Sequence, residues 1–201
     1  MNLARGPAGL SMLLALAGCG GSSTSVRDAA TAVDAANDDG GACRGTSLTD
    51  PVLDGVSLAV RGPCVFTLAQ ARAGLSVPFD IVVAHAVPGV VATPQDGGQC
   101  ERADASGLIP FAELTGGGQR YCLCDTGLCV PPSTTPVTLA AGTTSAQFTW
   151  DGVNWTGPSD TNNPKGAAFP AGSYTLRISA TGTVNGTAFT IAATYPITLV
   201  P

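Results

Sequence analysis

The side chains with the most chemical potential in this chain are its cysteines. Six of the seven lie beyond residue 42, at Cys43, Cys64, Cys100, Cys122, Cys124 and Cys129. The last three form a C-x-C-x4-C cluster, and thiolates at such spacing are ligands for Zn²⁺ or Cu⁺. The same six thiols can instead form three disulfides. The choice depends on the compartment, because disulfides persist where proteins are exported.

Other catalytic groups are scarce, since the chain has one histidine, His85, and one lysine, Lys165. A Ser-His-Asp or Cys-His site needs an imidazole at a cleft. His85 lies in the apolar alternation of residues 79–87, which favours a strand-end histidine bonded to the backbone, and Lys165 lies in a loop-like segment that faces solvent. No nucleotide-binding or metalloprotease motif occurs. We expect no enzyme and no cofactor; catalysis by His85 with a nearby carboxylate is kept as an alternative.

Oxygen ligands are grouped in one Gly- and Asn-rich stretch. The candidate calcium ligands there are Asp151, Asn154, Asp160 and Asn162. Asp and Asn also gather in turns for backbone reasons. We therefore expect no metal, and keep a calcium- or metal-binding protein as an alternative.

Charge and composition narrow the class further. The net charge of −5 with 11% charged residues makes nucleic acid an improbable partner. A hydrophobic fraction of 44% supplies a core, and 26 Gly with 15 Pro favour turns and strands over long helices.

The first 18 residues have the composition of a signal peptide, with Arg5 preceding an uncharged, leucine-containing stretch. Its end, Leu16-Ala17-Gly18-Cys19, resembles the lipobox of bacterial lipoproteins. The resemblance implies cleavage before Cys19, acyl chains on that residue and anchorage to a membrane. The resemblance also implies the outer membrane in preference to the inner one, because Gly20, and not Asp, follows Cys19. Residues 19–42 are small, polar and acidic, and predict a flexible tether.

Lipidation of Cys19 leaves an even number of thiols in an exported protein, which favours disulfides over metal. We predict the pairs Cys43–Cys64, Cys100–Cys122 and Cys124–Cys129. The alternative for the last two pairs is Cys100–Cys124 with Cys122–Cys129.

Residues 43–201 are predicted to be all-β, because short apolar alternations are separated by Gly, Pro, Asp and Asn. Val56, Leu58 and Val60 share one face of such a run, and Asn185-Gly186 fits a two-residue hairpin turn. About seven short antiparallel strands are expected in a β-sandwich. Residues 68–73 could form a helical turn, and residues 93–135 form a disulfide-rich insert.

The C-terminal half contains Trp150-Asp151-Gly152 and Pro170-Ala171-Gly172-Ser173-Tyr174-Thr175. These segments resemble Ig-like domains of the intracellular proteinase inhibitor family of bacilli and of flagellar hook-capping proteins. The resemblance implies an Ig-like sandwich with Trp150, Asp151, Gly152, Pro170, Gly172 and Tyr174 as fold markers. Tyr174 could form a tyrosine corner, in which the hydroxyl bonds an upstream backbone group.

Together these observations predict a non-catalytic Ig-like module, lipid-anchored to the bacterial envelope, with an interaction or structural role and a possible protein partner. One alternative is a protease inhibitor that presents residues 108–128 as a disulfide-held loop.

Overall fold

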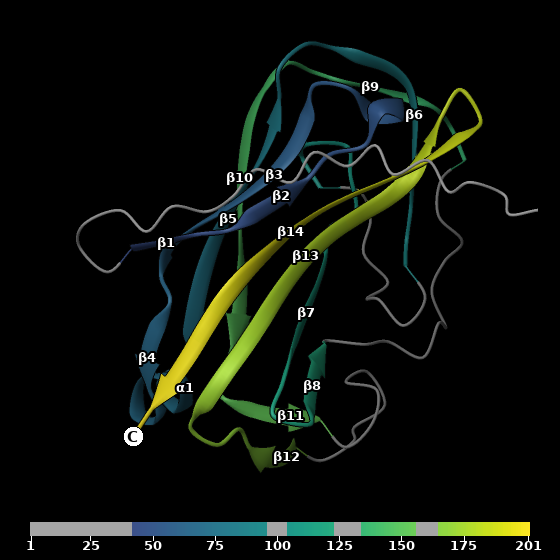
Figure 1. Cartoon of the computed structure of the whole chain (residues 1–201). Helices are drawn as coiled ribbons and strands as arrows, with labels where there is room; N and C mark the ends of the chain where they lie inside the picture. The colour runs from purple at the N-terminus through teal and green to yellow at the C-terminus, as the bar shows by residue number, and fades with distance from the viewer. Residues whose placement is uncertain (1–41, 96–103, 123–133, 156–164) are drawn as a thin grey trace, which may run out of the picture.

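The structure, a computed structural model, describes residues 42–95, 104–122, 134–155 and 165–201. The predicted signal peptide, Cys19 and the tether up to residue 41 lie outside these ranges. Within them the chain forms two large, mainly antiparallel sheets that pack as a sandwich, and a third sheet of two short strands, so the all-β prediction is confirmed (Figure 1).

The first sheet has the strand order β1-β3-β5-β10. Its strands are β1 (Ala42–Arg44), β3 (Val56–Pro63), β5 (Leu75–Val83) and β10 (Gly142–Trp150). Alternate residues of these strands face the second sheet, and Leu58 and Ile81 are completely buried there. The alternation of apolar residues in the sequence therefore predicted correctly which face of these strands is buried.

The second sheet is built on two long strands, β13 (Gly172–Val184) and β14 (Thr187–Val200), which lie side by side in Figure 1. The Asn185-Gly186 turn joins them, and both residues have positive φ, 50° and 84°. That conformation is the one a two-residue hairpin of this kind requires. These strands, of 13 and 14 residues, are much longer than the short strands expected from the sequence.

Shorter strands share the flanks of this hairpin. One flank of β14 carries β2 (Thr46–Leu48) and the parallel strand β4 (Val65–Thr67). The flank of β13 carries β6 (Val87–Thr93) and β7 (Phe111–Gly116), which are in turn flanked by β9 (Val137–Leu139) and β8 (Gln119–Cys122). A separate two-stranded sheet contains β11 (Val153–Trp155) and β12 (Lys165–Ala168).

β6 and β7 are two parts of one interrupted strand. Thr93, the last residue of β6, pairs with Thr181, and Phe111, the first residue of β7, pairs with Ser179. The two partners on β13 are two residues apart in the sequence, whereas Thr93 and Phe111 are eighteen residues apart. The chain thus leaves the sheet after Thr93 and re-enters it in line at Phe111. β7 and β8, which lie within the expected insert at 93–135, belong to the second sheet, and Leu114 of β7 is completely buried in the core.

Two short helical segments complete the described part: the 3-10 helix η1 (Pro51–Leu53) and α1 (Leu68–Ala73), the predicted helical turn. α1 begins in a capping box, in which Thr67 and Gln70 bond each other's backbone N–H groups. No helix among the described residues has the length and apolar character needed to cross a membrane.

Candidate functional site at the N-terminal corner

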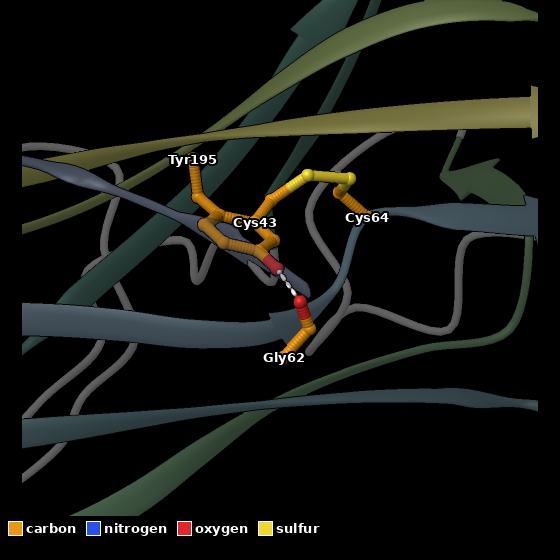
Figure 2. Close-up of a disulfide and its surroundings, with 4 residues drawn as sticks. All are labelled: Cys43, Gly62, Cys64 and Tyr195. Carbon is orange, nitrogen blue, oxygen red and sulfur yellow. Dashed lines mark hydrogen bonds between the residues drawn. A yellow bond between two sulfur atoms is a disulfide. The ribbon is translucent and has the colours of Figure 1, made fainter. Parts of the chain in front are cut away.

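The first described strand is fastened to the sandwich by a disulfide. β1 pairs with β3 over three residues, with Cys43 opposite Gly62. Cys64 follows β3 at the point where the chain crosses from the first sheet to β4 of the second. The Cys43–Cys64 disulfide joins the two segments, with Cα atoms 5.7 Å apart, and confirms this predicted pair (Figure 2).

Tyr195 of β14 reaches the same corner from the opposite sheet. Its side chain is completely buried, and its hydroxyl donates to the carbonyl oxygen of Gly62 (Figure 2). Burial raises the pKa of the Tyr195 hydroxyl, and a backbone hydrogen bond from Cys43 acts in the opposite direction. The phenol therefore stays protonated and links β14 with both β1 and β3.

The backbone of Cys64 is also tied to the last strand. Thr198 of β14 donates its N–H to the carbonyl oxygen of Cys64 at 2.6 Å, and β4 continues in parallel register with β14. The corner thus connects the start of the described chain with its final strand, through one covalent bond and several hydrogen bonds.

Four of the other predicted cysteines cannot be placed. Cys19, Cys100, Cys124 and Cys129 lie outside the described residues, and of Cys122 only the backbone in β8 is described. Their pairing stays a prediction.

The predicted fold markers gather at one end of the sandwich. Trp150 is 2% exposed, its indole N–H donates to the carbonyl oxygen of Val153, and its ring lies 4.7 Å from that of Phe169. The Tyr174 hydroxyl donates to Pro170 O, four residues upstream, at 2.7 Å. This is the contact expected of a tyrosine corner.

Two neighbouring glycines serve the turns at this end. Gly152 has φ of +75°, and its carbonyl oxygen accepts from the N–H of Phe169. Gly172 begins β13 directly after the Pro170 turn.

Of the candidate calcium ligands, Asp151 and Asn154 lie in the described part. The Asp151 carboxylate pairs with the ammonium group of Lys165, so a cation of the chain already occupies it. Asn154 lies in β11, and Asp160 and Asn162 lie outside the described residues. Across the described ranges, no group of three or more His, Cys, Asp or Glu side chains is arranged to hold a metal.

His85 does not lie on a buried strand face, which corrects the sequence interpretation. β5 ends at Val83 and β6 begins at Val87, so His85 lies in the turn between them and its side chain is 58% exposed. Its imidazole covers Gly55, and its Nε2 lies 4.0 Å from a carboxylate oxygen of Asp54. Val87, the first residue of β6, falls in the same period of two as Phe79, Ile81 and Val83 of β5, so the alternation in the sequence runs straight through the turn.

Sequence reasoning missed a contact between distant segments on the outer face of the second sheet. Ser179, a polar residue of β13, is completely buried. The side chain of Gln95 donates to Ser179 O and accepts from its hydroxyl, each at 3.1 Å. Gln95 lies just beyond the end of β6, so its amide secures the point where the chain leaves the sheet.

Comparison with known proteins gives no relative. No family model matches the chain, and neither the curated proteins nor the solved structures contain a match.

Proposed function

We propose that this protein is a lipid-anchored, non-catalytic Ig-like module of the bacterial envelope, with an interaction or structural role. Acyl chains on Cys19 hold it on a membrane, the outer one in preference to the inner, and the predicted tether of residues 19–42, whose last residue begins β1, acts as a flexible spacer. The lipobox and the polar, acidic composition of the spacer support this proposal. The Ig-like assignment is supported by the antiparallel sandwich and by the Tyr174–Pro170 contact.

The observation that carries the proposal is the disulfide where the spacer meets the folded part. Disulfides persist in exported proteins, and this one joins Cys43, the second residue of β1, to Cys64. A mechanical force on the spacer would act first on β1, which pairs with β3 over only three residues. The disulfide transmits this force to Cys64, whose backbone carbonyl is hydrogen-bonded to β14.

Metabolic labelling with an alkyne fatty acid tests the anchor in bacteria that produce the full chain. The wild-type chain should incorporate the label, fractionate with membranes and show an intact mass that starts at an acylated Cys19. Cys19→Ser should lose the label and the membrane association. Cys43→Ser/Cys64→Ser is the matched control, because it removes two other thiols but should keep the label. Recovery of an unlabelled chain with an unmodified N-terminal segment would refute the proposal.

A further inference from the structure

The outer edge of β10 is free for strand pairing within the described part of the chain. β10 pairs with β5 over nine consecutive residues without a register shift, and it ends the first sheet. Alternate N–H and C=O groups of such an edge strand point away from the sheet and offer a template for another strand. Its outward polar side chains do not cover the edge, because Ser145 donates to Asp80 at 2.7 Å and Gln147 accepts from Ser76 at 2.8 Å, both on β5.

The strands that end the sheets elsewhere in the described part are short or protected. β1, β2, β4 and β9 have three residues each, and β8 has four. β1 is closed by the disulfide, and β9 pairs irregularly with β6. Beside β2, the Asp50 carboxylate accepts from the N–H of Thr190 at 2.8 Å. Proteins commonly protect edges with short strands, charges, prolines and bulges. β10 has none of these features.

We propose that β10 pairs with β10 of a second copy of this chain. Its sequence, Gly-Thr-Thr-Ser-Ala-Gln-Phe-Thr-Trp, contains no charged residue. Antiparallel pairing about a two-fold axis places a strand opposite itself, so a strand with charges of one sign would repel its copy. Because β10 is uncharged, it can pair with its own copy without charge repulsion. It also has no charge that would favour binding of an oppositely charged strand from another protein.

Pairing centred on the middle residue, Ala146, uses the whole strand. Thr143 then lies opposite Thr149 of the second copy, and Ser145 opposite Gln147. All four side chains are exposed and polar, and polar cross-strand pairs stabilise sheets. The small side chain of Ala146 lies at the axis, opposite the same residue of the second copy, where a large side chain would meet its own copy. The two four-stranded sheets become one eight-stranded sheet.

The charge pattern across the axis provides the test. Thr143→Lys/Thr149→Lys places like charges opposite each other in both symmetry-related pairs. Thr143→Glu/Thr149→Lys places opposite charges at the same positions. Sedimentation equilibrium of the full chain in a density-matched detergent measures self-association, and thermal melts of all variants report folding.

We expect the unmodified chain to dimerise at concentrations up to about 100 µM. The Lys/Lys variant should weaken the dimer about tenfold, while the Glu/Lys variant should retain it, with similar melts. A chain that stays monomeric overturns the proposal. This holds also if the edge of β10 then binds a strand from another protein. Dimerisation with equal strength in all three proteins also overturns it. The acylation state of Cys19 does not enter this comparison, so the result is independent of the membrane anchor.

Discussion

Tyr195 and Gly62 connect the two sheets of the sandwich through one hydrogen bond, from a buried phenol to a backbone carbonyl oxygen. Gly62 is also the register partner of Cys43. The bond therefore lies directly beside the disulfide that fastens β1. A buried aromatic ring and a covalent bond secure the same three-residue strand.

Replacing Tyr195 by Phe tests the phenol. The ring would still fill the core, but the Gly62 carbonyl would lose its partner, so unfolding free energy should fall by about 1–2 kcal/mol. Chemical denaturation measures the loss. Tyr174→Phe is the control, since it removes a comparable bond to Pro170 at the other end. Only Tyr195→Phe should accelerate amide hydrogen exchange at residues 43 and 44; equal acceleration in both variants would contradict this role.

The buried tyrosines predict a specific alkaline sensitivity. Burial raises the pKa of Tyr174 and of Tyr195 above the ordinary value of 10.0. Their contribution to stability is therefore complete below pH 10 and disappears as the pH rises through the higher folded-state pKa values. Unfolding free energy measured from pH 8 to about pH 11 should be steady at first and then fall. Tyr174→Phe/Tyr195→Phe should flatten the fall; an unchanged slope would show that other groups cause it.

The disulfide should contribute strongly to stability. Cys43 and Cys64 are 21 residues apart, and a loop of that size corresponds to about 3 kcal/mol in the loop-entropy model. Cys43→Ser/Cys64→Ser should lower unfolding free energy by about this amount, measured by denaturation under oxidising conditions. Reduction of the wild type should lower its unfolding free energy by about as much as the double substitution does. A variant as stable as the oxidised wild type would argue against a structural role.

Gln95 is predicted to secure the exit of the chain from the second sheet. Gln95→Ala would leave the buried hydroxyl of Ser179 without its acceptor, and we expect a loss of about 1–2 kcal/mol. Gln95→Glu would retain an acceptor but remove the donor to Ser179 O, so it should fall between Ala and wild type. Gln147→Ala, on an exposed strand, should cost less than about 0.5 kcal/mol. Equal losses at both positions would refute a special role for Gln95.

Local signals account for the parts of the fold that were predicted correctly. Val56, Leu58 and Val60 are each at most 2% exposed, as their alternation indicated. Asn185 and Gly186 form the hairpin turn because their backbones tolerate positive φ. The Cys43–Cys64 pair, close in sequence, was also accessible to sequence reasoning.

The misread parts depend on pairing between distant segments. β14 continues through Pro196, although proline lacks the backbone N–H that a strand pair uses. On that flank β2 pairs up to Thr194 and β4 begins opposite Thr198, so the missing N–H of Pro196 falls in the gap between them. The burial of Ser179 likewise depends on Gln95, 84 residues away. No local pattern contains such information.

The interrupted strand has a consequence for variation of this protein. Since β6 and β7 occupy one line along β13, the sheet requires only that the chain return in phase at Phe111. The described residues between the two strands are not equally free to change, because Gln95 is hydrogen-bonded to Ser179 and Leu108 is completely buried in the core. Insertions or deletions between Thr93 and Phe111 should therefore be tolerated only where both of these anchoring contacts are kept.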